Sequence, residues 1–535
     1  MFAHPEPDLD GYVWMAKRIA HFEPLAVEQP NPFLYHSHAW VETSKGLVTT
    51  KYAPGYPFLL AVFYWLGDDN TMFFLPPLAA LLGLVGAYLL FREWMGRYAS
   101  LAAVFVLSIN DQFLFHSGYL LSHTTSLCLV VWGMYFLWRW HKTQGIGAGI
   151  GVGLCLGYAI TVRHTNLLLA APVAVALLAA LWRSWRVKQF RWQGFAALCG
   201  AYALFPVLLA IYQTIIFGAP WITGYALSDE QGAFSWAVLL ARHKILLNSA
   251  FDDFIFLVLP FGIAGAVVAG RWPDRLMRLL WILPIALLYA SYYWYMSHGA
   301  AFFRFMLALL PAMVGSAFLL FDQVRASFSG RAVAVTLLCG VMVWHSRGHI
   351  DAAWEDRYYH NGGKQIEPVA EFVDKHLEKD AVLFTAQTFH WVATLNEFTT
   401  YDLQRFHRYY PYRAFRETKR EITPEDMAHG RSPIRQQSRR KQEFRELYAN
   451  ASQADLNEWI VRITRQGLEE GRQVAILDTG RRGAHVARVL PDDMTLELLA
   501  EKEVGHDYRR GSYMLRLYVV RRDADEGDEG ARGAE

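Results

Sequence analysis

Long apolar runs alternate with short polar breaks over about the first 346 residues of the chain. An α-helix needs about 20 mostly apolar residues, with about 17 acceptable, to cross a hydrocarbon core about 30 Å thick. The runs therefore predict ten spans, at 72–91, 99–115, 118–138, 146–162, 165–182, 194–217, 254–270, 279–296, 305–321 and 332–346. The apolar run from Tyr56 to Leu66 is too short to cross, so we expect a helix lying in the membrane interface.

Beyond these runs the pattern becomes that of a soluble domain. Apolar positions recur at helical spacing over Glu367–Leu377 and are followed by an apolar strand, Ala381–Thr385. Two further strands are expected at Val474–Asp478 and Tyr513–Val520. These elements predict a small α/β domain.

The same domain contains a basic stretch, Arg405–Arg445, with twelve Lys or Arg against five Asp or Glu. Its plain interpretation is a solvated insertion, and the alternative is contact with anionic lipid head groups or an anionic acceptor. The tail, 523–535, is Gly-rich and charged, which predicts disorder. The chain thus divides into a first segment (1–71), a helical membrane domain (72–346), the soluble domain (347–522) and this tail.

Composition supports this division. With 53% hydrophobic and only 19% charged residues, the chain is too apolar for a soluble protein of 535 residues. The formal net charge of +2 argues against a general polyanion binder, so no nucleic-acid partner is expected. All four cysteines lie inside apolar runs, which argues against a disulfide framework or a zinc site.

The Lys and Arg residues of the short loops favour one orientation in the membrane. The loops after the odd-numbered spans hold thirteen: Arg92, Arg97, Arg139, Lys142, Arg183, Arg186, Lys188, Arg191, Arg271, Arg275, Arg278, Arg325 and Arg331. The opposite loops hold four: Arg163, Arg242, Lys244 and Arg304. We expect the thirteen inside, which places residues 1–71 and the soluble domain outside. Since so long an N-terminal stretch is not easily exported alone, one more helix is expected before Met1.

Ionisable residues at the predicted outer boundary are the candidates for chemistry, because such groups must be paired, hydrated or used. The first outer segment and the outer helix ends supply Asp8, Asp10, Lys51, Arg163, His164 and Arg304. A carboxylate facing several cations suits transfer from a phosphate-linked donor. The carboxylate removes the acceptor proton as a general base, and the cations neutralise charge developing on the leaving phosphate.

Each candidate also has a purely structural interpretation. An Arg at a helix end, such as Arg163 or Arg304, can snorkel to lipid head groups. Asp8, so near a terminus, is by itself more often a solvated surface group. His123 is more often a hydrogen-bonded helix residue than a catalyst, and Asn110-Asp111 is favoured as a polar loop tip over part of an acceptor site.

The stretch Asp8-Leu9-Asp10-Gly11-Tyr12-Val13-Trp14-Met15-Ala16-Lys17 resembles the first outer loop of C-type (GT-C) glycosyltransferases. That superfamily includes protein O-mannosyltransferases and the enzymes that transfer aminoarabinose to lipid A. Its loop has an Asp-Glu pair followed by Tyr and then by Ala with a basic residue. The spacing to Tyr12 and Ala16 aligns Asp8 with the family Asp, while Leu9 replaces the usual Glu and leaves Asp10 as the candidate second acid.

Later stretches resemble the same superfamily, particularly bacterial members, in order and spacing over about residues 8–320. They are Lys51-Tyr52-Ala53-Pro54-Gly55-Tyr56-Pro57, where Ala53 replaces Pro, then Phe91-Arg92 to Gly96-Arg97, Tyr119 to Thr124, Tyr212 with Phe217 to Pro220, Gly224-Tyr225, and Arg304-Phe305 to Pro311. Each motif alone is weak, but together and in order they are specific.

The resemblance implies a mostly α, polytopic transmembrane helical bundle of the GT-C type with a C-terminal extracytoplasmic α/β domain, in the cytoplasmic (inner) membrane. It implies an inverting glycosyltransferase that takes a sugar from a polyprenyl-phosphate donor at the outer face. The acceptor, whether lipid, glycan or protein, is not identified by the sequence.

By position, the resemblance assigns Asp8, with Asp10 beside it, as the catalytic carboxylates and Lys51, Arg163 and Arg304 as contacts to the donor phosphate. Candidates for substrate binding are Tyr12, Tyr52, His123, His164 and Tyr225. Some superfamily members use a divalent metal such as Mg or Mn and others do not. The sparse carboxylates favour metal independence, and no residue is assigned as a metal ligand.

Two other classes of function stay open. A transporter or flippase of lipid-linked saccharide would also suit many helices with outer-face charges. Ion-coupled transporters usually place ionisable groups near the midplane, however, and no acidic residue is expected at mid-depth here. An inactive relative that acts as a binding protein is the third interpretation, because Leu9 stands where the family has Glu.

Overall fold

The computed structural model describes residues 7–28, 34, 39–188, 190–228, 230–292, 299–323, 328–359, 363–385, 398–406, 451–478, 486, 489–507 and 511–522. Its α-helices are α1 (Pro7–Ala20), α2 (Gly55–Met72), α3 (Leu75–Trp94), α4 (Arg97–Ser108), α5 (Asp111–Ser117), α6 (Ser122–Thr143), α7 (Ile146–Val152), α8 (Tyr158–Val162), α9 (Ala170–Val187), α10 (Trp192–Phe217), α11 (Gly224–Leu227), α12 (Trp236–Ser249), α13 (Val258–Val268), α14 (Trp272–Ala290), α16 (Leu310–Asp322), α17 (Phe328–Tyr359), α18 (Gly363–His376) and α23 (Gln453–Glu469).

Short 3-10 or π-helical turns are η1 (Gly153–Gly157), η2 (His164–Leu169), η3 (Glu230–Ala233), η4 (Ala250–Ile255), η5 (Gly299–Leu309) and η7 (Leu403–Phe406). The strands are β1 (Trp40–Glu42), β2 (Val48–Thr50), β3 (Val382–Thr385), β4 (Thr399–Asp402), β5 (Val474–Asp478), β6 (Met494–Asp507) and β7 (Gly511–Arg522).

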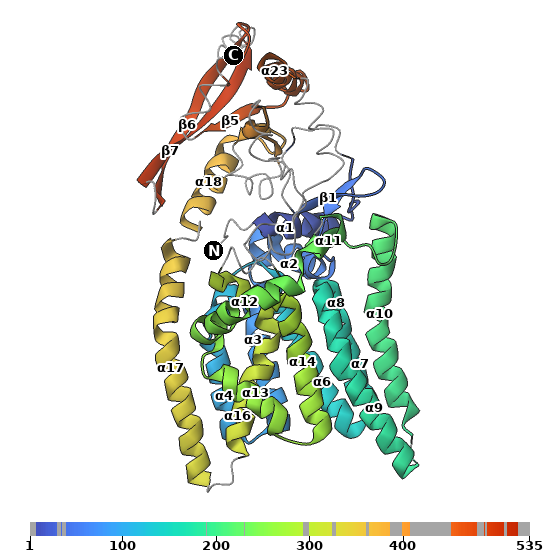
Figure 1. Ribbon diagram of the computed structural model, residues 1–535. Helices are drawn as coiled ribbons and strands as arrows, with labels where there is room; N and C mark the ends of the chain where they lie inside the picture. Colours follow the sequence, from blue (N-terminus) through green and yellow to red (C-terminus); the bar gives the residue numbers. More distant parts are fainter. Residues whose placement is uncertain are drawn as a thin grey trace.

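The helices from α3 to α17 form a bundle with the C-terminal sheet beyond one end (Figure 1). Among the described residues, four helices are long and apolar enough to cross a membrane: Leu75–Trp94, His164–Val187, Trp192–Phe217 and Phe302–Asp322. Two shorter apolar helices, Ile146–Val162 and Val258–Val268, lie among them. The predicted fold class, a polytopic helical bundle with a small C-terminal α/β domain, is confirmed. The count of ten spans stays a prediction.

The predicted span 99–115 is not one straight helix. α4 and α5 are bent by 65° at a short break, and together they count as a fifth candidate span, broken or re-entrant. At the break, the Asn110 side chain accepts a hydrogen bond from the backbone N–H of Phe113, 3.1 Å away, and so caps α5. Asn competes for backbone donors in this way, which explains why an apolar run can be interrupted there. Asn110 thus marks a helix start.

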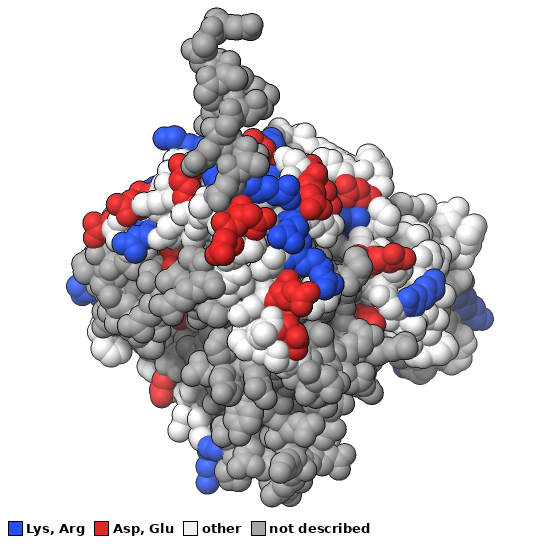
Figure 2. Space-filling model, turned by 90° about the horizontal axis from the view of Figure 1, so that it is seen from above, with Lys and Arg blue, Asp and Glu red and all other residues white. Residues whose placement is uncertain are grey.

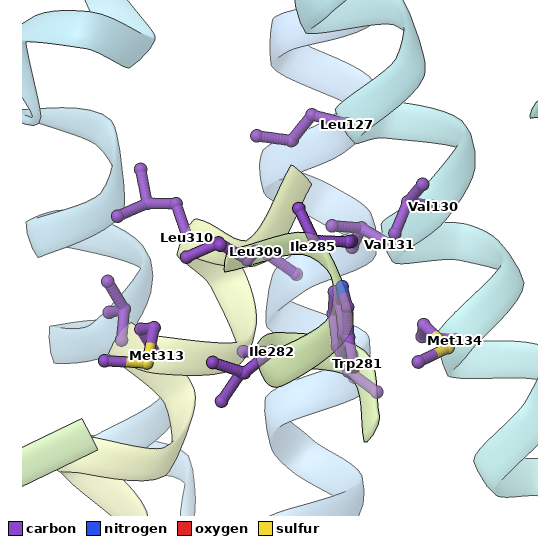
Figure 3. Packing of buried hydrophobic residues seen from close by; sticks show 14 of the residues in the cluster. Leu127, Val130, Val131, Met134, Trp281, Ile282, Ile285, Leu309, Leu310 and Met313 are labelled. Atoms are coloured by element: carbon purple, nitrogen blue, oxygen red, sulfur yellow. The ribbon is translucent and has the colours of Figure 1, made fainter. Parts of the chain in front are cut away.

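The side chains of α6, α14 and α16 interdigitate in the middle of the bundle (Figure 3). Trp281 of α14 fills the space toward α6, and its indole N–H donates to the carbonyl of Ala308 at 2.9 Å. Lipid tails are as apolar as these side chains, so close packing rather than exclusion of water holds such helices together. This packing fixes α6, α14 and η5, which carry much of the candidate site.

The two ends of the bundle differ in what they carry. α1, α2, β1, α11 and the C-terminal sheet lie at one end, here called the upper end (Figure 1). At the opposite, lower end the basic loops contact one another. Lys142 pairs with Glu93 at 2.8 Å, and the Asp322 carboxylate accepts from the Gly96 N–H at 2.9 Å. The loops predicted to share one side of the membrane therefore share one end of the bundle, while their orientation stays a prediction.

The predicted interfacial helix is part of α2, which lies beside α1 at the upper end (Figure 1). Its backbone leaves the helical region at Gly67 and Asp68, one residue after the predicted end at Leu66. A depth in the membrane interface stays a prediction for this helix.

The C-terminal sheet has the strand order β4-β3-β5-β7-β6, in which β3 runs parallel to β4 and β5, and β7 antiparallel to β5 and β6. α18 covers one face, where Leu383 and Ala475 point, and α23 covers the other, where Phe384 and Ile476 point. Strands buried on both faces read as continuous apolar runs, which is why β3 and β5 were predictable. β4, β6 and α23 were not predicted.

The described surface of this domain mixes both signs of charge. Seen from the upper end, blue and red residues alternate (Figure 2), and cross-strand pairs such as Arg521–Glu497 at 3.2 Å account for part of the pattern. The predicted basic insertion and the predicted disordered tail lie outside the described residues except at the insertion's first two positions. The domain touches the first segment through a β-bridge between Leu34 and Tyr401.

Candidate active site

One aromatic ring at the upper end has two guanidinium groups beside it. The ring belongs to Phe305 of η5, and its centroid is 5.5 Å from the Arg163 guanidinium and 5.2 Å from that of Arg304. Tyr289 of α14 stacks on the same ring at 5.3 Å, and the His123 ring of α6 meets it edge-on at 5.4 Å. Segments far apart in sequence thus converge on one point.

Arg163 is held by neutral partners. It follows α8 in an extended conformation (φ −147°, ψ 119°), which ends the helix and turns the side chain toward α6 and α14. Its Nη1 donates to Ser122 Oγ at 3.2 Å and lies 3.1 Å from His123 Nδ1, and its Nη2 donates to the Tyr289 hydroxyl at 3.1 Å. A His nitrogen can accept from a guanidinium only when it carries no proton.

A partly buried Arg normally has a carboxylate partner, because a charge removed from water is costly unless it is paired. Arg163 contacts hydroxyls, an imidazole and an aromatic ring, and no carboxylate among the described residues. Arg304, 7% exposed, brings a second positive charge to the same ring. The arrangement is suited to an anion.

α1 joins this cluster through Tyr12. The Tyr12 hydroxyl is hydrogen-bonded to Ser122 Oγ at 3.1 Å, the same oxygen that accepts from Arg163. Its ring stacks on Tyr52 with centroids 4.2 Å apart. Asp10, two residues earlier, is buried at 2% exposure. The backbone of Asp8 lies in the first turn of α1, one helical turn before Tyr12, and its side chain is outside the described part of the chain.

A third cation, Lys51, lies beside the Tyr52 ring. Its ammonium forms an ion pair with Glu230 of η3 and lies 5.6 Å from the Tyr52 ring and 5.8 Å from the Tyr225 ring. The side chains of Lys51 and Glu230 are 8% and 13% exposed. A salt bridge so shielded from water is energetically different from one on the surface.

The Lys51 backbone is packed directly on α11. A Cβ added to Gly224, the first residue of α11, would lie 2.3 Å from the Lys51 Cα and 2.5 Å from its carbonyl oxygen. Only glycine permits this approach of two backbones. The Gly224-Tyr225 motif therefore sets both the position of Lys51 and that of the ring beside it.

His164, next to Arg163 in the chain, lies beside Tyr225, the ring that also neighbours Lys51. Its Nε2 is hydrogen-bonded to Gln213 Nε2 at 2.9 Å, so this ring nitrogen accepts from the amide, and its ring meets Tyr225 edge-on at 6.0 Å. Its Nδ1 is buried and has no hydrogen-bond partner among the described residues. A neutral imidazole has one accepting and one donating nitrogen. Because Nε2 accepts, Nδ1 carries the proton, and it can donate to a ligand.

The structure thus brings most of the predicted site residues to one end of the bundle: Asp10, Tyr12, Lys51, Tyr52, His123, Arg163, His164, Tyr225 and Arg304. Sequence reasoning did not single out the residues that contact them: Ser122, Gln213, Glu230, Tyr289 and Phe305. Ser122 and Phe305 lay within quoted motifs; nothing local marked the other three. In the described part of the chain, no group of three or more His, Cys, Asp or Glu is placed to hold a metal ion.

Known proteins resemble this chain both in sequence and in fold. Residues 51–230 match the family described as dolichyl-phosphate-mannose-protein mannosyltransferase, a stretch that runs from Lys51 to Glu230. ArnT from Cupriavidus metallidurans, solved bound to undecaprenyl phosphate, aligns with a TM-score of 0.56 and 13% identity over 97% of this chain and 94% of that one. Its apo structure aligns with the same TM-score and 12% identity. No curated protein matches in sequence.

The oligosaccharyltransferase of Archaeoglobus fulgidus aligns less well, with a TM-score of 0.45 and 15% identity over 75% of this chain and 58% of that one. The helical bundle, the upper-end cluster and the ArnT alignment define a polytopic membrane protein with the GT-C fold. Together with the family match, they place the chain in the GT-C superfamily of membrane glycosyltransferases.

Proposed function

We propose that the protein transfers a sugar from a polyprenyl-phosphate donor to an acceptor at the outer face of the membrane, with inversion at the anomeric carbon. The observation that carries the proposal is Arg163, a partly buried cation with neutral partners that shares the Phe305 ring with Arg304. A donor phosphate would supply the missing negative charge. The undecaprenyl phosphate bound to ArnT, which has the same fold, supports this class of ligand.

In the proposed reaction an acceptor nucleophile attacks the anomeric carbon of the donor sugar from the face opposite the phosphate. The bond from this carbon to the phosphate oxygen breaks, and its electron pair leaves with polyprenyl phosphate. The phosphate charge grows from about −1 toward −2, and Arg163, Arg304 and Lys51 stabilise that increase. The acceptor proton goes to the carboxylate of Asp8, with Asp10 as the second acid of the same turn.

Ser122, His123 and Tyr289 would act as positioning residues. Each forms a hydrogen bond with the Arg163 guanidinium. The guanidinium is therefore oriented before the donor binds. Preorganised donors stabilise developing charge more than mobile ones, because no reorganisation is needed during the reaction.

Donor consumption tests the proposal. The wild-type protein, purified in nanodiscs, would be given a panel of radiolabelled polyprenyl-phosphate sugars and compared with Asp8→Asn, Arg163→Ala and, as a matched control, Arg97→Ala. Arg97 is an exposed arginine at the start of α4, at the lower end. We expect one donor to be consumed by the wild type and by Arg97→Ala, with a fall of about 10² to 10⁴ in Asp8→Asn. If no donor is consumed or bound, the transporter and binding-protein interpretations replace this one.

The outer-face location has its own test. In a variant without the four native cysteines, a cysteine at the exposed position Lys45, near the site, or at Lys188, in the lower-end loop between α9 and α10, would be exposed to an impermeant maleimide. In right-side-out vesicles Lys45→Cys should react and Lys188→Cys should not. The reverse result would contradict the proposed orientation.

A further inference from the structure

Resting on the proposed function, we propose that Glu230 is the counter-ion that the donor phosphate displaces from Lys51, and that it binds Lys51 again when polyprenyl phosphate leaves. Glu230 is thereby a positioning residue that sets donor affinity and product release. It acts through Lys51 and does not touch the reacting atoms.

The pair is exclusive. Among the described residues, Glu230 is the only carboxylate that contacts Lys51, and Lys51 is the only ion-pair or hydrogen-bond partner of the Glu230 side chain. The remaining neighbours of the Lys51 ammonium are the rings of Tyr52 and Tyr225. Since aromatic faces attract a cation but do not neutralise it, Glu230 is the group among the described residues that balances the charge of Lys51.

This pairing conflicts with simple binding of a phosphate. An ammonium occupied by a carboxylate gives little net attraction to a second anion, because the two negative charges would repel each other across one cation. Opening the pair without a replacement is also costly when both groups are shielded from water. Exchange, in which a phosphate oxygen takes the place of the Glu230 oxygen, avoids the free-energy cost of leaving either charge unpaired.

The backbone indicates which partner moves. Lys51 follows β2, its N–H donates to the Ala39 carbonyl at 2.7 Å, and Gly224 packs on its Cα. Glu230 begins a single four-residue 3-10 turn, Glu230–Ala233, between the short helix α11 and α12. Short 3-10 turns have poorer hydrogen-bond geometry than α-helices and shift more easily. The ammonium therefore stays in place and the carboxylate withdraws.

The exchange has a consequence for turnover. Polyprenyl phosphate carries more negative charge as a product than as the phosphodiester of the donor, so a site built only of cations would hold its product more tightly than its substrate. A carboxylate that competes for Lys51 counters this. Product release limits the rate of many enzymes, and Glu230 would accelerate that step.

The test measures binding of undecaprenyl phosphate to the full-length protein in nanodiscs, with the uncharged alcohol undecaprenol as the reference ligand. The variants are Glu230→Gln, Lys51→Met, the double variant and, as a matched control, Glu93→Gln, which removes the carboxylate of the exposed Lys142–Glu93 pair at the lower end. We expect Glu230→Gln to bind undecaprenyl phosphate about tenfold more tightly, because the carboxylate no longer competes with the phosphate for Lys51. Lys51→Met should bind more weakly, and Glu230→Gln should raise affinity less in its background than in the wild type, because no ammonium remains to be released.

Inhibition by added undecaprenyl phosphate gives a second measurement, which general damage to the fold would not reproduce. Glu230→Gln should be inhibited at a lower concentration and show a lower KM for donor together with a lower kcat. Wild type that binds undecaprenyl phosphate, with Glu230→Gln binding it equally or more weakly, overturns this inference and leaves the proposed function standing. Wild type that prefers undecaprenyl phosphate no more than undecaprenol overturns both.

Discussion

The cations at the two ends of the bundle have different surroundings. At the lower end, Lys142 is 48% exposed and pairs with Glu93, and Arg191 donates to the carbonyl of Thr143 at 2.8 Å. At the upper end, Lys51 and Arg304 are buried, and Arg163 has only neutral partners among the described residues. Lys and Arg occur at both ends, so residue type alone does not distinguish the two groups of cations.

The difference teaches which charges set topology and which set chemistry. Exposed cations that can reach water or head groups cost little and bias orientation in the membrane. Cations shielded from water cost more, and a fold keeps them where an anion compensates the cost. At the lower end the exposed cations are solvated or paired, as Lys142 is with Glu93, and the buried Arg278 donates to the carbonyl of Ala269. At the upper end we propose that a donor phosphate compensates the shielded cations.

The largest effect should come from Arg163→Ala, which removes a cation whose partners among the described residues are all neutral. We expect donor consumption to fall by about 10² to 10³, the usual loss when one preorganised donor to a developing charge is removed. Arg163→Lys should recover only part of the rate, because an ammonium cannot contact Ser122, His123 and Tyr289 as the planar guanidinium does.

Single-turnover measurements of sugar transfer by both variants, beside the lower-end variant Arg97→Ala, would check this. Equal rates for Arg163→Ala and Arg97→Ala would mean that Arg163 belongs with the lower-end cations, and the contrast between the ends would be lost.

Gly224→Ala should have the next largest effect. A methyl group 2.3 Å from the Lys51 Cα forces α11 away from Lys51, and overpacking of this kind costs about 1–3 kcal/mol. If that strain is relieved by losing the position of Lys51, affinity for undecaprenyl phosphate should fall about 10- to 100-fold.

Gly200→Ala in α10 is the control, since no atom lies within 4 Å of its added Cβ. Isothermal binding measurements on both variants decide the matter. Unchanged affinity in Gly224→Ala would show that the Lys51 backbone position is not needed for the phosphate.

The bundle could be predicted from the sequence because the bilayer imposes a helix length that a run of apolar residues reveals. The run predicted at 72–91 became α3, Leu75–Trp94, and that predicted at 194–217 became α10, Trp192–Phe217. α12 was missed because Arg242 and Lys244 interrupt its apolar positions. The bend after α4 was missed because a single Asn cap leaves the hydropathy almost unchanged.

The candidate site was predictable only in part, for a different reason. A cation at a helix end, such as Arg163, is visible as a break in an apolar pattern, and Lys51 could be found because it begins a motif, Lys51 to Pro57, that resembles a known family. Their partners are set by contacts between distant positions: Tyr289 is 126 residues from Arg163, and Glu230 is 179 residues from Lys51. No local period or spacing encodes such contacts, and only the packing of helices brings them together.

Asp322→Ala tests the lower end, where we expect an effect on stability and none on chemistry. The Asp322 carboxylate accepts from the Gly96 N–H, the first orphan donor before α4, and a negative charge there also suits the positive end of the helix. Its loss should cost about 1 kcal/mol. Thermal unfolding in detergent should show a small decrease, with donor consumption within about twofold of wild type. A loss of transfer comparable to that of Arg163→Ala would couple the two ends.

The smallest effect is expected from Lys142→Ala. Its ammonium pairs with Glu93, but the two side chains are 48% and 21% exposed, and exposed pairs contribute about 0–1 kcal/mol because water and salt screen them. The unfolding temperature and donor consumption should both stay near wild type. The same chemical pair, Lys with Glu, is proposed to control donor affinity at Lys51 and Glu230, where burial removes that screening. A decrease in donor affinity in Lys142→Ala as large as that in Lys51→Met would show that neither burial nor position along the bundle determines what a lysine does here, and it would contradict the comparison of the two ends.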